Sequence, residues 1–130
     1  MIEGTCHCGK VRWTFDGVPA RATACNCTIC RRYGGLWAHG WEGEAIDVSG
    51  ETRFYVWGDR ELGFHACVGC GCIAYTRGLE PNPDGRRWMA VNLRMAEPDQ
   101  VGAIPIRHFD GCETWEERPP DGRTVADMWF

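Results

Sequence analysis

The chain has 130 residues, nine cysteines, seven tryptophans and a formal net charge of −4 at pH 7. This length fits one compact domain and excludes a multidomain machine. No run of about 18 apolar residues is present to cross a membrane, and the acidic balance leaves no basic stripe for phosphates. We therefore expect neither a membrane nor a nucleic acid as a partner.

The expected elements are short strands bounded by turn residues. In chain order, the candidate strands are Lys10–Phe15, Thr52–Trp57, Cys72–Tyr75, Trp88–Leu93 and Ile104–Phe109. Asp84-Gly85 predicts the turn of a hairpin, because glycine adopts a positive φ at little cost. No 12-residue helical pattern is present. The fold class is therefore mostly β, in a single domain over residues 1–130 whose polar end, 116–130, could form a mobile tail.

Aliphatic side chains are scarce. Ile, Leu, Val and Phe together make up 23 of the 130 residues, so an apolar core alone would be marginal against the entropy of ordering the chain. We expect an additional staple, either a disulfide or a metal. The N-terminus reaches Cys6 and Cys8 before the apolar region of a secretory signal could form. This favours a reducing compartment, and we predict a cytoplasmic protein.

The spacing of the cysteines is the strongest signal in the sequence. They occur as Cys6-x-Cys8, Cys25-x-Cys27-x-x-Cys30, Cys67-x-x-Cys70-Gly71-Cys72 and a single Cys112. A Cys-x-x-Cys turn lets two thiolates converge on one tetrahedral cation, and two such pairs staple distant segments. The alternatives are a secreted disulfide protein, which the odd count and tight doublets disfavour, and a redox-active Cys-x-x-Cys pair. The pattern favours zinc.

The number of ligands bears on function. The first three clusters supply seven thiols, apart from Cys72, and seven divides naturally into four and three. Four thiolates close a structural zinc site, whereas three leave a position open for water or a substrate thiol. Spacing alone does not pair the clusters, and Cys72 or Cys112 could complete a second closed site. An enzyme and a purely structural zinc protein both remain compatible with the count.

Several motifs taken together resemble one known family. They are Gly4-x-Cys6-x-Cys8-Gly9-x-Val11, Cys25-x-Cys27-x-x-Cys30-Arg31-Arg32-x-Gly34, His65-x-Cys67-x-x-Cys70-Gly71, Val91-Asn92-Leu93 and His108-Phe109-Asp110-Gly111. In this order and at these intervals, the chain resembles the glutathione-dependent formaldehyde-activating enzyme (GFA) family, which also includes centromere protein V. The resemblance implies an Mss4-like fold of small coiled β-sheets stapled by zinc.

The resemblance also implies ligand sets and an activity. A structural zinc would be held by Cys6, Cys8, Cys67 and Cys70, and a second, open zinc site by Cys25, Cys27 and Cys30. Two zinc ions per chain are therefore expected. In the family's named enzyme the second metal is associated with joining glutathione and formaldehyde into S-(hydroxymethyl)glutathione. The chain is thus expected to be a carbon–sulfur lyase whose partners are a small thiol and a small aldehyde, or their adduct.

Other residues leave alternatives open. Arg31 and Arg32 could anchor a substrate carboxylate beside the second zinc, or could offset the charge of the thiolates. Two functions other than a lyase are also compatible with the sequence. One is a non-catalytic zinc module with every metal position closed, and the other is a thiol oxidoreductase that uses Cys72 or Cys112. No histidine is assigned a catalytic role, and Trp37 and Trp41, just after the three-cysteine cluster, are expected to wall a pocket.

Overall fold

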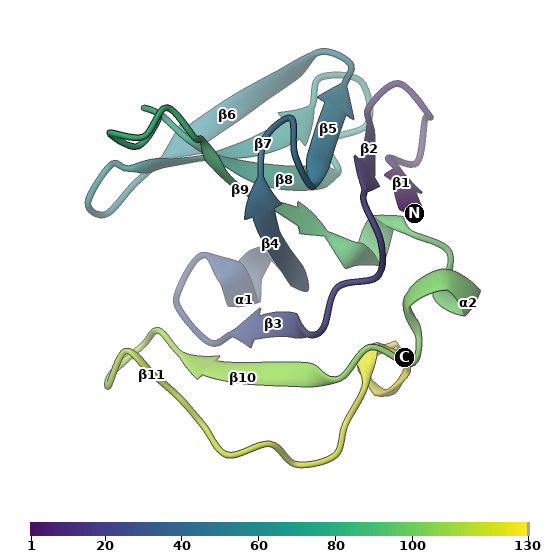
Figure 1. Ribbon diagram of the computed structural model, residues 1–130, viewed down its shortest axis with the longest axis vertical. Helices are drawn as coiled ribbons and strands as arrows, with labels where there is room; N and C mark the ends of the chain where they lie inside the picture. Colours follow the sequence, from purple (N-terminus) through teal and green to yellow (C-terminus); the bar gives the residue numbers. More distant parts are fainter. Residues whose placement is uncertain (130) are drawn as a thin grey trace.

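Two β-sheets form the part of the chain that the structure, a computed structural model, describes, which is residues 1–129 (Figure 1). The smaller sheet contains β1 (Ile2–Thr5), β2 (Arg12–Phe15) and β5 (Ile46–Ser49), in the order β1-β2-β5. The larger sheet contains β3 (Ala22–Cys25), β4 (Trp37–Trp41), β6 (Thr52–Val56), β7 (Leu62–Cys67), β8 (Ile73–Gly78), β9 (Trp88–Asn92), β10 (Ile106–Asp110) and β11 (Glu116–Glu117). Its order is β11-β10-β3-β4-β9-β8-β7-β6, and its neighbouring strands are antiparallel except for the parallel pair β3 and β10.

The helices are single turns. They are α1 (Cys30–Tyr33), the 3₁₀ turn η1 (Leu93–Met95), α2 (Pro98–Val101) and the 3₁₀ turn η2 (Val125–Met128). Gly34 ends α1 in the left-handed conformation, with φ of 65°, and its N–H donates to the carbonyl of Cys30. The prediction of a mostly β fold without long helices is confirmed.

The five strands expected from the sequence are present as β2, β6, β8, β9 and β10, with shifted ends. The expected hairpin is also confirmed, since β8 and β9 pair antiparallel with Tyr75 opposite Val91 and Gly85 has φ of 85°. The sequence did not predict strands β1, β4 and β7, because each contains a glycine, which weakens the alternation of apolar and polar residues typical of a strand. Packing requires glycine at position 4, since a Cβ there would clash with the ring of Trp13.

Tryptophan supplies much of the apolar area that aliphatic residues do not. Trp13 of β2 is 1% exposed and lies in the larger core, between the two sheets, with Ile46 and Met89. A second, smaller core surrounds α1 and contains Trp37 and Phe64 among its buried members. The sulfur atoms of the three-cysteine cluster therefore lie in an aromatic setting.

The C-terminal segment is attached to β10. The N–H of Arg118 donates to the carbonyl of His108 (2.8 Å), and the N–H of Val125 donates to that of Ile104 (2.8 Å). Val125 is fully buried. The expected mobile tail of residues 116–130 thus contains a strand, a 3₁₀ turn and a core residue, while Phe130 lies outside the described residues. The mobility of the 116–130 segment stays a prediction.

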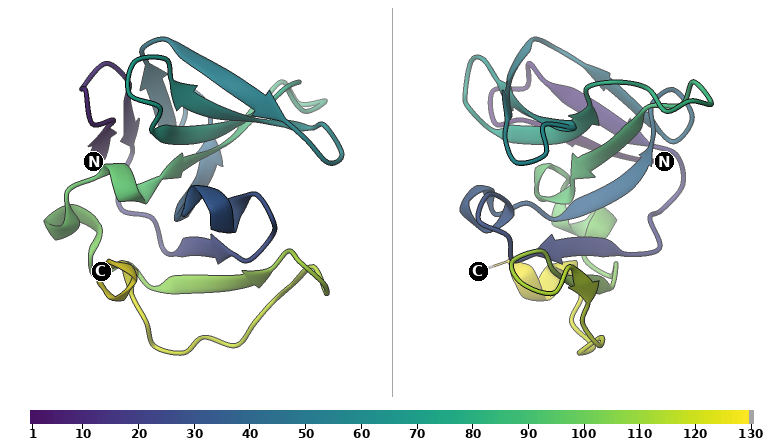
Figure 2. Two further views of the ribbon diagram at one scale, coloured as in Figure 1. Left: turned by 180° about the vertical axis from the view of Figure 1, so that it is seen from behind. Right: turned by 90° about the vertical axis from the view of Figure 1, so that its left-hand side faces the viewer.

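The larger sheet bends where β3 meets β4. The two strands pair only at Thr23 and Trp37, whereas β4 and β9 pair along the whole of β4. Figure 2 shows the result from two further sides, with β3 and β10 on one side of α1 and β6 to β9 on the other. Side chains on the inner face of this bend surround the cleft described below.

Candidate metal centres and the adjoining cleft

The first cysteine cluster joins two β-turns that are far apart in the sequence. The sulfur atoms of Cys6 and Cys8, from the β1–β2 connection, of Cys67, at the end of β7, and of Cys70, in the turn that follows, all lie within 4.8 Å of one another. The Sγ atoms of Cys6 and Cys8 are 3.5 Å apart, and those of Cys8 and Cys67 are 3.6 Å apart. Tetrahedral zinc with Zn–S bonds of about 2.3 Å needs sulfur separations of roughly 3.8 Å. The cluster could therefore hold a metal ion of this kind.

Backbone amides point at these sulfur atoms. The N–H of Val11 donates to Cys6 Sγ (3.2 Å), and the N–H of Gly69 donates to Cys67 Sγ (3.3 Å). The pKa of Cys70 is lowered to about 5, first by the backbone N–H of Cys72 and then by that of Cys8. Such donors stabilise thiolates, the form in which cysteine binds metal.

The second cluster follows β3 and begins α1. The sulfur atoms of Cys25, Cys27 and Cys30 lie within 4.8 Å of one another, and the N–H of Cys30 donates to Cys27 Sγ (3.4 Å). The pKa of Cys25 is lowered to about 5, chiefly by a hydrogen bond from the Cys30 thiol and also by the N–H groups of Cys27 and Gly111. The pKa of Cys30 is raised, first by that same bond to Cys25 and then by burial. Three soft sulfur donors, one of them readily ionised, suit zinc.

A loop after β10 packs directly onto the second cluster. A Cβ added to Gly111 would lie 2.6 Å from Cys25 Sγ, so a side chain at this position would meet the sulfur. The loop is held by Asp110, which is 3% exposed and accepts hydrogen bonds from Asn26 Nδ2 (3.0 Å) and Thr114 Oγ1 (2.9 Å). These donors, Asn26 first, hold the pKa of Asp110 well below its usual range. Asn26 Oδ1 in turn accepts the N–H of Cys112 (3.0 Å).

These supporting residues were not identified as such from the sequence. Asp110 and Gly111 appeared there only within the His-Phe-Asp-Gly stretch of the family resemblance, and Asn26 only as the spacer between Cys25 and Cys27. The available signals were a polar residue between two clustered cysteines and an Asp-Gly pair after a strand. Their pairing is a tertiary contact between parallel strands, which spacing does not reveal.

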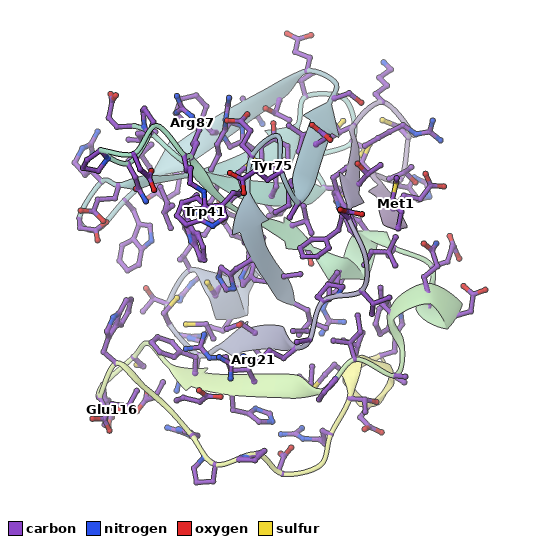
Figure 3. The ribbon with its side chains drawn as sticks, in the orientation of Figure 1. Met1, Arg21, Trp41, Tyr75, Arg87 and Glu116 are labelled. Atoms are coloured by element: carbon purple, nitrogen blue, oxygen red, sulfur yellow. The ribbon has the colours of Figure 1, made fainter. Side chains whose placement is uncertain are left out.

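A cleft of about 600 Å³ opens beside the second cluster, on the inner face of the bent sheet. Its walls come from β3, β4, β7, β8, β9 and β10, from the start of α1 and the segment before it, and from the loops after β6 and β10. The lining residues that bear on its chemistry are Cys25, Cys27, Cys30, Trp37, His39, Trp57, Asp59, Glu61, Phe64, Trp88, Arg107, Phe109, Gly111 and Trp115. In Figure 3, sulfur atoms lie beside α1, with Arg21 on the β3 side and Trp41 on the β4 side.

Two basic side chains line this cleft. Arg107 lies over the ring of Phe109, with 4.8 Å from the guanidinium carbon to the ring centroid, and its Nε is 3.5 Å from a carboxylate oxygen of Glu117. The ring of His39 stacks on Trp88 at 5.3 Å. His39 is exposed at the surface of the cleft, and desolvation by the groups around its ring, with secondary contributions from the charges of Arg107 and Arg21, lowers its pKa to about 4. His39 is therefore a neutral imidazole at pH 7.

The other residues singled out in the sequence lie outside the two clusters. Arg31 and Arg32 are exposed on α1 and are not among the cleft-lining residues, and Arg32 Nη1 donates to the carbonyl of Thr28 (2.7 Å). Their role as substrate anchors stays a prediction. Cys72 is half-buried and Cys112 exposed, and neither belongs to a metal-compatible group within residues 1–129.

Trp37 and Trp41 both line a pocket, as expected. Trp37 lines the cleft beside the three-cysteine cluster, whereas Trp41 lines an adjoining depression with the β8–β9 hairpin. His65 is buried between the rings of Phe54 and Tyr75 and its Nδ1 is 2.8 Å from Thr52 Oγ1, so its ring is engaged away from the cysteines.

The fold and the clusters define a small β protein with two cysteine sites suited to metal. The family model described as glutathione-dependent formaldehyde-activating enzyme matches residues 1–104, and the chain belongs to this GFA family. The chain is also similar to the crystal structure of a Rhodobacter sphaeroides protein determined as a structural genomics target. The two share 25% identity and a TM-score of 0.60, over 81% of this chain and 99% of that one.

No curated protein matches the chain. Among residues 1–129, every helix is too short to cross a membrane.

Proposed function

We propose that the protein is a zinc-dependent carbon–sulfur lyase-type enzyme that joins a low-molecular-weight thiol, such as glutathione, to formaldehyde or another small aldehyde. The observation that carries this proposal is the position of the three-cysteine cluster in the wall of the cleft, where it offers three sulfur ligands. Membership of the GFA family supports glutathione and formaldehyde as the substrate classes.

The remaining parts of the proposal concern the metal sites. Cys6, Cys8, Cys67 and Cys70 hold a structural zinc that staples an Mss4-like arrangement of small sheets, and Cys25, Cys27 and Cys30 hold a second zinc. Zinc bound by three thiolates keeps a fourth position at which a thiol or water is acidified. The protein acts in the cytoplasm on small molecules, without a nucleic acid or a membrane.

The reaction needs no oxidant. The thiol sulfur forms a bond to the aldehyde carbon, the π bond of the carbonyl opens, and the thiol proton ends on the former carbonyl oxygen. The N–H groups of Cys27 and Gly111 hold negative charge on Cys25. The aromatic walls place apolar surface beside the reacting groups. At the exposed end of α1, Arg31 and Arg32 attract the carboxylates of an approaching substrate.

Exchange NMR with ¹³C-formaldehyde and glutathione tests this function, because it measures the rate of adduct formation above the uncatalysed background. The protein as purified should accelerate the exchange, and Cys27→Ser should abolish the acceleration. Cys112→Ser, which changes an exposed cysteine outside both clusters, should leave it unchanged. A rate equal to background with every small thiol and aldehyde tried would refute the proposal and favour a closed, structural zinc module.

A further inference from the structure

The lining of the cleft is aromatic. Six aromatic side chains among the described residues face it, namely Trp37, Trp57, Phe64, Trp88, Phe109 and Trp115. They come from four strands and two loops, so they surround the space instead of forming one patch. A volume of about 600 Å³ is within the range of small-molecule sites.

Charge in the cleft does not favour a ligand with two carboxylates. Asp59, Glu61 and Arg107 are the charged lining residues in the part of the chain that the structure describes, and His39 is neutral at pH 7. Arg107 is partly engaged, because its Nε is 3.5 Å from a carboxylate oxygen of Glu117 and its Nη1 is 3.5 Å from Thr23 Oγ1. Glutathione carries two carboxylates and one ammonium group, so at least one of its carboxylates would lose water beside an acidic lining without gaining a guanidinium partner.

Trp115 is held in a conformation that its own packing does not explain. Its φ is 59°, in the left-handed region that bulky residues avoid. Trp115 is 71% exposed, and its ring lies beside Gly111 and packs at a near right angle to the ring of Phe109, with 5.2 Å between the ring centroids. The N–H of Trp115 donates to the carbonyl of Asp110 (2.7 Å), which fixes the strained turn. A strained residue that presents a large exposed ring at the rim of a cleft is typical of a ligand contact.

We propose that this cleft selects thiols with an uncharged aromatic body, and their aldehyde adducts, over glutathione. The inference rests on the proposed function, which places the substrate sulfur at the three-cysteine cluster. With the sulfur there, the attached ring lies within the aromatic walls, where contacts with the lining rings stabilise it. Trp115 and Trp57 cover it from the two loops. The bond changes are those given above, with the aromatic thiol in the place of glutathione.

Cobalt-substituted protein provides a binding assay that is independent of turnover, because its visible absorption changes when a sulfur ligand is added. The probes are benzyl mercaptan and glutathione, titrated separately. We expect benzyl mercaptan to bind at least about tenfold more tightly, since aromatic contacts of this kind are worth roughly that factor. Trp115→Ala should remove most of the preference. Tyr55→Ala is the matched control, since Tyr55 is also an exposed aromatic residue, at 55%, but does not line the cleft.

A thiol-free probe separates the two proposals. Benzyl alcohol should give saturation-transfer NMR signals with the wild-type protein and with Tyr55→Ala, and weaker signals with Trp115→Ala. If both thiols change the cobalt spectrum with equal affinity, or Trp115→Ala behaves like Tyr55→Ala, the aromatic selectivity is wrong and the proposed function stands. If no thiol changes the spectrum but benzyl alcohol binds as expected, the proposed function fails and the thiol selectivity that rests on it fails too, while the affinity of the cleft for an aromatic ring is supported. If benzyl alcohol does not bind, the selectivity is refuted.

Discussion

Gly111→Ala probes the contact between the β10 loop and the second cysteine cluster. The new Cβ would lie 2.6 Å from Cys25 Sγ and 3.2 Å from the Cβ of Cys27. Since non-bonded carbon and sulfur atoms need about 3.5 Å or more, the loop or the sulfur must move by roughly 1 Å. The shift also weakens the N–H donation from Gly111 that stabilises the Cys25 thiolate.

We expect this substitution to lower zinc affinity at the second site by about 10–100-fold, the range found when groups that support metal ligands are changed. Overpacking should lower the free energy of unfolding by about 1–3 kcal/mol. Competition with chelators of graded strength measures the affinity, and circular dichroism during denaturation measures the stability. Zinc at the first cluster should be retained.

Gly69→Ala is the control for Gly111→Ala. A Cβ at Gly69 would lie 3.4 Å from Cys8 Sγ and 3.6 Å from Cys67 Sγ, which is ordinary contact. This variant should keep the wild-type zinc affinity at the second site. If Gly111→Ala also keeps it, the loop does not support the cluster in the way that the structure indicates, and our reasoning on the site is wrong.

Three further predictions concern the two cysteine clusters, the cleft and the C-terminal segment. Cys67→Ser should unfold or strongly destabilise the protein, whereas Cys27→Ser should leave a folded protein with one zinc fewer; equal loss of circular dichroism in both variants would contradict the division of roles. His39 should titrate near pH 4 in NMR, and because the unfolded chain would take up this proton at about pH 6.5, its contribution to stability should fall as the pH drops from 6.5 toward 4; an ordinary midpoint near 6.5 would show that the cleft does not desolvate the ring. Val125→Ala should lower the free energy of unfolding by about 1–2.5 kcal/mol, because Val125 is fully buried; no loss in a denaturant titration would mean that the C-terminal segment is detached.

Local patterns in the sequence predict the mostly β fold class well. Alternation in segments such as Thr52–Trp57 and the turn at Gly85 are properties of neighbouring residues, and these elements are confirmed. Strands β3 and β4 were not predicted, because Ala22–Cys25 is too short to alternate and His39 and Gly40 interrupt the apolar pattern of β4. What makes them strands is pairing with β10 and β9.

The two cysteine groupings expected from the family resemblance are each brought together in the structure. Spacing alone could not have paired Cys6 and Cys8 with the Cys67 turn, since that grouping depends on how the sheets stack. The cleft was less predictable, because its walls combine residues as distant in sequence as Thr23 and Trp115. Proximity in sequence does not predict that Arg31 and Arg32 line the cleft, since both follow Cys30 directly but are exposed to solvent and lie outside its lining.

The central claim is that the three-cysteine cluster holds an open zinc site. Zinc content per chain, combined with X-ray absorption at the zinc edge before and after addition of a thiol, tests it most directly. We predict one zinc for each of the two clusters, with the average number of sulfur ligands rising when thiol is added. A single zinc, or two whose sulfur coordination does not change with any thiol, would contradict the claim and leave a structural zinc protein.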